Sequence, residues 1–341
     1  MKIVILGLPM AGQQELFSLL TGIHLDNVKQ KRMEVQLGIC EVKDPRVTKL
    51  IEMYNPAKKA YARIEYLLLP DFILTGPIKD MIFNNLKNSD EICFITRHET
   101  AETDIPSFIS ELVIFDLMAV EKRLENIAKD QKKKMLEARA KEEALMKMCK
   151  VQLESEKPLK DLAFTAEQLT ALKTYQFLTM KPLFFVINVP EDKINDVSIS
   201  KTMTDKFKYP CIQVSAAIEE EISRLEKADY AEFMKEMGIK ESALDKMNQM
   251  AFSGLGLISY FTVGTDEVRA WPVRKGALAP EAGGVIHSDI ERGFVRAEMF
   301  KYNDFIAAGS EAKLKEQGKF YLKGKDYMVE DGDILSFRVG T

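Results

Sequence analysis

Short apolar runs separated by polar turns fill two stretches of the chain, from Met1 to about Glu111 and from about Lys181 to Ala217. The runs are rich in β-branched and aromatic residues, and helical stretches lie between them. Strands of a parallel sheet covered on both faces have this pattern, because both of their faces are buried. We therefore predict an α/β fold with one doubly wound sheet, interrupted by an insertion. The predicted strands are Ile3–Leu6, Ile64–Leu69, Ile92–Ile95, Leu183–Ile187 and Cys211–Val214.

The insertion spans about residues 112–180. Its apolar residues recur at steps of three and four within a Lys/Glu-rich sequence, which is the spacing of one face of an amphipathic helix. We predict a long helical arm folded as an antiparallel hairpin. The apolar positions are Leu117, Val120, Leu124 and Ile127, followed by Leu145, Met148 and Leu153.

Positive charge is concentrated in this arm. Residues 119–150 hold ten Lys and Arg against six Asp and Glu, whereas the whole chain has a formal net charge of −4. Such a run ordinarily forms a solvated helix face. The alternative is that a protruding basic arm contacts RNA phosphates, an attraction that does not depend on sequence.

The C-terminal region, from about Leu255, is rich in short strands. A tight-turn signal at Glu330–Asp333 is expected to join two neighbouring strands. We predict a small separate α+β domain, whose twelve basic and thirteen acidic residues over 256–341 give it no electrostatic preference for nucleic acid. The predicted strands are Val268–Val273, Phe294–Phe300, Tyr327–Val329 and Ile334–Val339.

The composition limits the classes of protein to consider. A chain of 341 residues suggests two or three domains. No apolar run approaches the roughly 20 residues that span a membrane, and no signal peptide is evident, so we expect no membrane contact and a cytoplasmic location. The four cysteines and three histidines are too scattered to indicate a disulfide framework or a zinc site.

The first 21 residues have the form of a phosphate-binding loop. Gly7 and Gly12 keep the glycine spacing of G-x-x-x-x-G-K-[ST], but Gln13 and Gln14 stand at the Lys and Ser/Thr positions. A glutamine amide carries no charge to neutralise phosphates and is a poor magnesium ligand. The backbone N–H groups and the start of the predicted helix can still attract an anion. A strand, a glycine turn and a helix also occur in α/β proteins without a nucleotide site.

About eighty residues of the C-terminal region hold five notable segments: Tyr260–Trp271, Ala279–Pro280, Val285–Glu298, Tyr302–Phe305 and Gly324–Asp333. Together they resemble the TGS domain of the YchF/Obg-like ATPase family. Two further segments resemble the family in order, Leu37–Leu50 its second-strand region and Leu172–Pro182 its return from the arm, so the resemblance covers essentially the whole chain.

The resemblance implies three parts. A P-loop GTPase-like, nucleotide-binding domain would span 1–111 and 181–254, a coiled-coil arm 112–180, and a TGS domain of β-grasp type 255–341. The family prefers ATP over GTP and associates with ribosomes. It therefore implies a monomer that meets the ribosome or RNA through its TGS domain and the arm residues Lys129, Lys132, Lys133 and Lys134.

In this family the preference for adenine is attributed to an N-x-x-E motif. Asn188–Glu191 matches this motif at the end of a predicted strand. Val214–Glu219 resembles the loop that backs the base. The alternative is that Asn188 and Glu191 only form a turn. The candidate nucleotide contacts are Leu8, Pro9, Met10, Ala11, Gly12, Gln13, Gln14 and Glu15, then Asn188, Val189 and Glu191, and Ser215, Ala216 and Ala217.

Departures from the family pattern gather on the phosphate side. The family's D-I-A-G, whose Asp orients the magnesium shell, aligns with Leu68–Asp71, which puts an apolar residue at the aspartate position. An alternative alignment, by a short slip, makes Asp71 the magnesium aspartate. The switch loop is shortened to Phe72–Lys79. We expect His98 to be a surface histidine rather than the family's histidine linked to hydrolysis.

Three hypotheses follow. We favour a pseudo-NTPase that binds ATP weakly or not at all. The sequence leaves its use of magnesium open and assigns no catalytic or metal-binding residue. The second is a working ATP or GTP hydrolase in which Lys31, Arg32 or Lys79 substitutes for the missing charge. The third is a nucleotide-free scaffold that only contacts another macromolecule.

Overall fold

The computed structural model describes residues 1–73, 76–129, 136–239 and 241–340. These residues form two units, which are described separately: one holds Met1–Gly38 and Glu65–Met247, the other Ile39–Ile64 and Asn248–Thr341. Within the described ranges, no helix is both long enough and apolar enough to cross a membrane.

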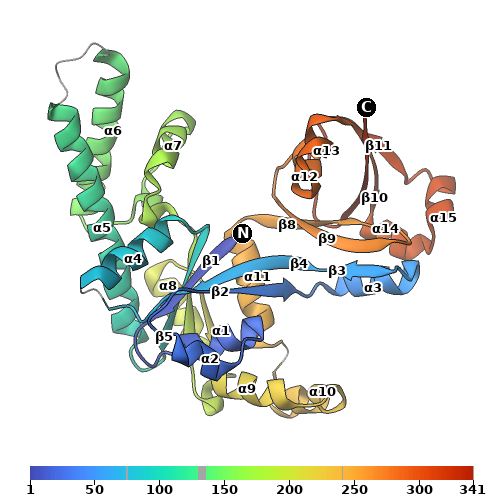
Figure 1. Ribbon diagram of the computed structural model, residues 1–341, viewed down its shortest axis with the longest axis horizontal. Coiled ribbons are helices and arrows are strands. Elements are labelled where there is room, and N and C mark those ends of the chain that lie inside the picture. The colour runs from blue at the N-terminus through green and yellow to red at the C-terminus, as the bar shows by residue number, and fades with distance from the viewer. Residues whose placement is uncertain (74–75, 130–135, 240, 341) are drawn as a thin grey trace. The chain divides into compact units, whose positions relative to one another are not determined.

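A six-stranded sheet in the order β2-β4-β1-β5-β6-β7 organises the first unit (Figure 1). Neighbouring strands from β4 to β7 are parallel, as predicted. The five predicted strands are confirmed, and β2 is added at the edge, where it and β4 run from one unit into the other. The strands are β1 Lys2–Gly7, β2 Gln36–Val42, β4 Ala62–Leu68, β5 Glu91–Arg97, β6 Leu183–Asn188 and β7 Cys211–Val214.

Both faces of this sheet are buried. Val4 and Leu6 of β1 belong to a cluster with side chains of α4, α5, α8 and α9, and the alternate residues Ile3 and Ile5 are also fully buried. Because side chains alternate between faces along a strand, burial of both sets requires cover on both sides. The helices are α1 Gln13–Thr21, α2 Leu25–Gln30, α4 Gly76–Lys87, α5 Ala101–Lys129, α6 Leu136–Glu154, α7 Ala166–Leu172, α8 Ser198–Phe207, α9 Ala216–Arg224 and α10 Lys227–Glu236, with 3-10 turns at Leu159–Asp161, Lys173–Tyr175, Leu178–Met180 and Glu191–Lys193. Helix α11, Ala243–Gly254, begins in this unit and ends in the second.

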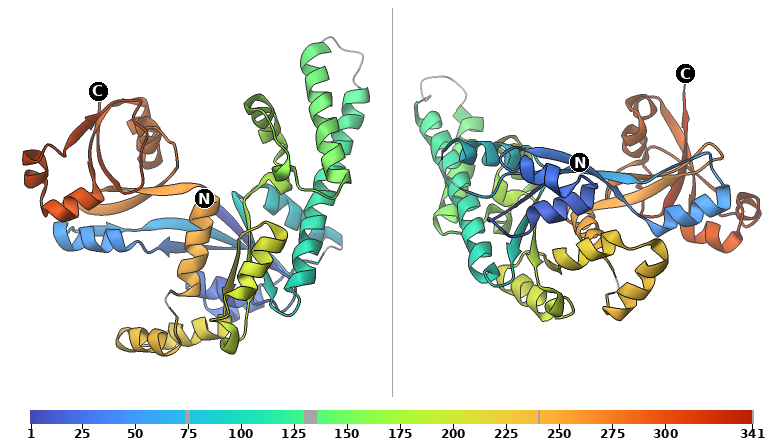
Figure 2. Two further views of the ribbon diagram at one scale, coloured as in Figure 1. Left: turned by 180° about the vertical axis from the view of Figure 1, so that it is seen from behind. Right: turned by 60° about the horizontal axis from the view of Figure 1, so that its bottom comes forward.

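The long helices α5 and α6 lie side by side and antiparallel (Figures 1 and 2). Val120 and Ile127 of α5 pack with Leu145 and Leu153 of α6, so the predicted helical hairpin is confirmed. Of the basic residues that we assigned to partner contact, Lys129 is the exposed last residue of α5. Lys132, Lys133 and Lys134 lie outside the described residues.

A buried carboxylate ties α5 to the segment that leads into β6. Asp116 is fully buried and accepts hydrogen bonds from the amides of Leu178 and Thr179, at 2.9 and 2.8 Å, and from the Thr179 hydroxyl at 2.7 Å. Burial raises the pKa of Asp116 to about 6, against the opposing effect of these three hydrogen bonds.

The second unit is built on a sheet in the order β11-β10-β12-β8-β9-β3. Helix α3 belongs to this unit, where its Val47 and Leu50 pack with Phe261 and Phe300. Arg46 at its start lies over the Phe261 ring and bonds both carboxylate oxygens of Asp331. The elements are β3 Lys58–Ala60, β8 Leu257–Thr262, β9 Glu267–Arg274, β10 Phe294–Lys301, β11 Tyr321–Lys323, β12 Asp333–Val339, α3 Pro45–Tyr54, α12 Ala279–Ile286, α13 Ser288–Arg292, α14 Tyr302–Ala308 and α15 Glu311–Glu316.

One predicted strand in this unit is wrong. Segment 327–329 is not a strand beside β12 but makes an isolated bridge, from Met328 to Leu278. The buried Asp333 carboxylate accepts hydrogen bonds from the Tyr327 hydroxyl at 2.7 Å and from the Glu330 amide at 2.9 Å. These bonds hold the segment in a loop, so the turn at 330–333 closes that loop instead of a hairpin.

We expect Asp116→Ala to lower the free energy of unfolding by about 3 kcal/mol, because three buried donors lose their acceptor. The matched control is Glu125→Ala on the same helix, where only an exposed ion pair at 3.8 Å to Lys129 is lost. Urea denaturation at neutral pH measures both variants. Equal losses would contradict the anchoring role of Asp116.

A second prediction concerns Glu91 at the start of β5, which is 1 % exposed and has one buried carboxylate oxygen without a partner among the described residues. Burial, with a smaller effect of Asp90, raises its pKa to about 8. Because the folded-state pKa lies above the unfolded one, Glu91 weakens the fold progressively as the pH rises from about 4.5 through 8.

Glu91→Gln should therefore gain stability relative to the wild type as the pH is raised from 5 to 8.5, by on the order of 2 kcal/mol. Thermal unfolding across this range measures the effect, with the exposed Glu221→Gln as control. Parallel pH curves for the wild type and Glu91→Gln would contradict it.

Candidate functional site

The loop between β1 and α1 is tightly wound. The Ala11 amide donates to the Leu8 carbonyl at 3.1 Å, and Met10 and Gly12 have left-handed φ values of 65° and 96°. A Cβ on Gly12 would lie 2.4 Å from the Asn188 side-chain nitrogen. Position 12 therefore requires glycine, because of both its positive φ and its closeness to Asn188. The side chain of Met10, in contrast, is 85 % exposed.

Asn188, at the end of β6, joins this loop to the loop before α9. Its Nδ2 donates to the Ala11 carbonyl at 3.1 Å, and its Oδ1 accepts from the Ala216 amide at 3.1 Å. The Val189 amide donates to the Val214 carbonyl at 2.8 Å, and the Ser215 side chain caps α9. The carboxyl ends of β1, β6 and β7 thus meet where ligands bind in open parallel sheets.

Glu191 and Ala217 are both exposed, and Glu191 opens the 3-10 turn after Asn188. Within the described ranges, no hydrogen bond joins the Glu191 side chain to either loop. The structure therefore brings Asn188, Ala11 and Ala216 into contact, while Glu191 remains a candidate by its position in the motif alone.

The phosphate side is occupied by a side-chain pair. Gln13 is 2 % exposed, and its Nε2 donates to Asp71 Oδ1 at 2.6 Å. Its Oε1 is buried and has no partner among the residues that the structure describes. Asp71 follows β4, and the next amide, that of Phe72, donates to the Gly7 carbonyl at 2.8 Å. The parallel pairing of β1 and β4 thus brings Asp71 to the loop.

A cavity of about 470 Å³ opens at this pair. Of the three cations that we considered as substitutes for the missing lysine, Arg32 lines it, whereas Lys31 and Lys79 do not. Lys29, which we had not considered, also lines it and forms a 3.0 Å ion pair with Glu15. The lining residues are Pro9, Met10, Gly12, Gln13, Gln14, Glu15, Lys29, Arg32 and Asp71.

Asp71, which the alternative alignment makes the magnesium aspartate, is not among the predicted nucleotide contacts, although it lines the cavity with Gly12, Gln13 and Gln14. The order of the strands could have predicted this position of Asp71. A residue that directly follows a strand paired with β1 lies at the same edge of the sheet as the loop after β1. His98 is also placed differently from our expectation of a surface position. Its side chain is 14 % exposed and lies between Lys193 Nζ, at 2.9 Å, and Glu99, at 3.1 Å.

The two sides of the site fit a nucleotide unequally. On the base side, two hydrogen bonds hold the Asn188 amide in place, and the loop at 215–217 follows directly. On the phosphate side, α1 begins with free N–H groups at its first turn, but the Asp71 carboxylate lies against Gln13 where a positive charge is needed. Within the described ranges, no three His, Cys, Asp or Glu residues are grouped so as to hold a metal ion.

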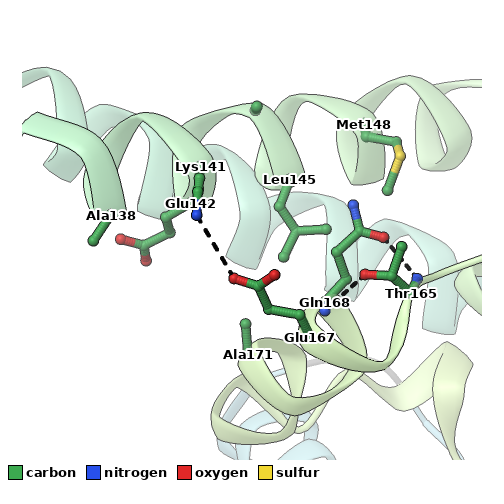
Figure 3. Close-up of a pocket in the computed structure, with 10 residues that line it drawn as sticks. Ala138, Lys141, Glu142, Leu145, Met148, Thr165, Glu167, Gln168 and Ala171 are labelled. Carbon is green, nitrogen blue, oxygen red and sulfur yellow. Dashed lines mark hydrogen bonds and ion pairs between the residues drawn. The ribbon is translucent and has the colours of Figure 1, made fainter.

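A second, larger cavity of about 1010 Å³ lies in the arm between α6 and α7 (Figure 3). Leu145, Met148 and Ala171 give it a mainly apolar lining. Among its three charged residues, Lys141 and Glu167 face each other across the groove at 3.9 Å, and Glu142 pairs with Arg123. With these charges paired, it offers no arrangement suited to polyphosphate.

Comparison with known proteins decides the family. The YchF-GTPase_C model, described as "Protein of unknown function (DUF933)", matches residues 257–340. A Bacillus subtilis (strain 168) protein named "Ribosome-binding ATPase YchF" is 38% identical over 359 aligned residues, which cover 98% of each chain. The chain belongs to the YchF family. A Haemophilus influenzae relative of the same name is 33% identical and covers 99% of this chain and 98% of its own.

The fold comparison agrees with this membership. The structure of the Schizosaccharomyces pombe YchF GTPase matches with a TM-score of 0.85 and 26% identity, covering 99% of this chain and 97% of that one. The predicted P-loop GTPase-like fold with a further C-terminal domain is thereby confirmed, as is the resemblance to the YchF family.

We expect Gly12→Ala to lower the free energy of unfolding by about 2–3 kcal/mol, since the substitution combines backbone strain with a clash against Asn188. Gly22→Ala, at the other end of α1, is the matched control, with a φ of 71° and no atom within 4 Å of the added Cβ. It should cost only the strain, about 1 kcal/mol. Chemical denaturation that gives equal losses would contradict the close approach of Gly12 to Asn188.

Proposed function

We propose that this YchF-family protein is a degenerate nucleotide-binding member, a pseudo-NTPase that binds ATP weakly or not at all and hydrolyses it inefficiently. The observation that carries the proposal is the 2.6 Å hydrogen bond from Gln13 to Asp71. It puts a neutral amide and a carboxylate where phosphoryl transfer needs positive charge.

The base side of the site, formed by Asn188 and the loop at 215–217, supports weak recognition of a nucleoside. Asn188 is held by the backbone of both adjoining loops, and Ser215, Ala216 and Ala217 follow β7 directly. We infer that any bound nucleotide is held from this side, with adenine preference depending on Glu191. The oxygen-bearing side chains that line the cavity are Gln13, Gln14, Glu15 and Asp71, and Glu15 is already paired with Lys29, which favours weak magnesium coordination.

We further propose that the protein acts on the ribosome in the cytoplasm, as a monomer. Relatives from Bacillus subtilis and Haemophilus influenzae are named ribosome-binding ATPases. The surfaces proposed for this contact are the coiled-coil arm, 112–180, and the TGS domain, 255–341, attached to a nucleotide-binding domain of 1–111 and 181–254. Sedimentation of the purified chain with ribosomes through a sucrose cushion tests this part.

The second candidate is an active ATPase. It is favoured by Arg32 and Lys29, whose positive charges line the cavity beside the loop. A nucleotide-free scaffold is the third. The three are separated by whether nucleotide binds and whether it turns over.

Calorimetric titration with ATP, ADP and GTP, each with and without Mg²⁺, tests the proposal. We expect weak or absent ATP binding by the wild type and at least about a tenfold gain in Gln13→Lys/Gln14→Ser, which restores a cation and a hydroxyl. Adding Asn188→Ala should remove that gain.

Tight magnesium-dependent ATP binding by the wild type, with turnover, would favour the active ATPase. Absence of nucleotide binding by both the wild type and the double variant would favour the scaffold.

A further inference from the structure

We propose that Asp71 is a specificity-determining residue that excludes the terminal phosphate, so that the site prefers nucleoside mono- and diphosphates to triphosphates. The inference rests on the proposed nucleotide site. It goes further by naming the class of ligand and the residue that selects it.

The first argument is the position of the carboxylate. Asp71 lines the same cavity as Gly12, Gln13 and Gln14, where α1 begins. The start of a helix attracts an anion through its free N–H groups and its dipole. In this protein an anionic side chain already stands at that place, 2.6 Å from the buried Gln13 amide.

The second argument is the charge balance of the cavity. Its lining contains two cations, Lys29 and Arg32, and two carboxylates, Glu15 and Asp71. Lys29 is paired with Glu15 at 3.0 Å, and Arg32 makes no ion pair within the described part of the chain. One unpaired cation can offset a short phosphate group, but each added phosphate brings more negative charge toward Asp71.

The third argument is that the carboxylate is held in place. Its partner Gln13 is 2 % exposed, and the amide of the next residue, Phe72, bonds the Gly7 carbonyl at the end of β1. Asp71 therefore cannot swing away from an incoming phosphate without breaking the bond to Gln13. A fixed charge discriminates more strongly than a mobile one, because it does not relax around the wrong ligand.

The test is titration calorimetry of the full chain with AMP, ADP and ATP, without and with Mg²⁺. Asp71→Asn keeps a side-chain oxygen to accept from Gln13 and removes the charge. We expect it to raise the affinity for ATP at least tenfold and that for AMP less than threefold. Asp80→Asn, an exposed carboxylate on α4 outside the cavity, is the control for net charge and should change neither affinity.

Asp71→Gly in the Gln13→Lys/Gln14→Ser background keeps the test decisive if wild-type binding is too weak to measure. There it should add a further gain of about tenfold for ATP, since a lysine at position 13 would otherwise pair with Asp71. Thermal unfolding of each variant checks that the fold is intact.

Three outcomes would overturn the inference. An ATP-to-ADP affinity ratio unchanged by Asp71→Asn would overturn it alone and leave the proposed nucleotide site standing. Magnesium-dependent ATP binding by the wild type that Asp71→Asn abolishes would make Asp71 a metal ligand instead. Absence of binding in every variant, the triple variant included, would overturn the nucleotide site together with the inference.

Discussion

The amide of Asn188 is the interaction on which the candidate site depends. Its two hydrogen bonds connect the carbonyl of Ala11 with the amide of Ala216, and so connect loops that follow β1 and β7. The Asn188 side chain, at the end of β6, thus holds the two loops together at the carboxyl edge of the sheet. The requirement for glycine at position 12 is a direct consequence, because only a residue without Cβ leaves room for that amide.

The parts of the fold that burial dominates were predictable from sequence. β5 is apolar from Ile92 to Ile95 and β6 from Leu183 to Ile187, and the arm repeats its apolar residues at helical steps. Four strands, β2, β3, β8 and β11, were not predicted. Two of them, β3 and β11, are only three residues long, which is too short to show an apolar pattern. Segment 327–329 misled us because its loop is held by the Asp333 carboxylate, which hydropathy does not register.

The candidate site was predictable in part, and the missing part is informative. Glycine spacing located the loop, and the N-x-x-E motif located Asn188, because both are local patterns. The pairing of Gln13 with Asp71 links residues 58 positions apart and arises from strand order, which no local pattern encodes. The same holds for Asp116, which accepts hydrogen bonds from amides 62 and 63 residues further along the chain. Hydrogen bonds between residues far apart in the sequence therefore fix parts of this structure that hydropathy and local motifs do not predict.

The composition of the second unit bears on how the chain is made. Val47 and Leu50 of α3 belong to a core completed by Phe261, Phe300 and Phe305. A ribosome that synthesises this protein releases α3 more than 200 residues before its core partners emerge. During that interval α3 can contact near neighbours such as Ala62 but lacks its aromatic partners, so this unit can close only when translation is almost finished. Folding in order of synthesis is therefore available to the first unit's sheet but not to α3.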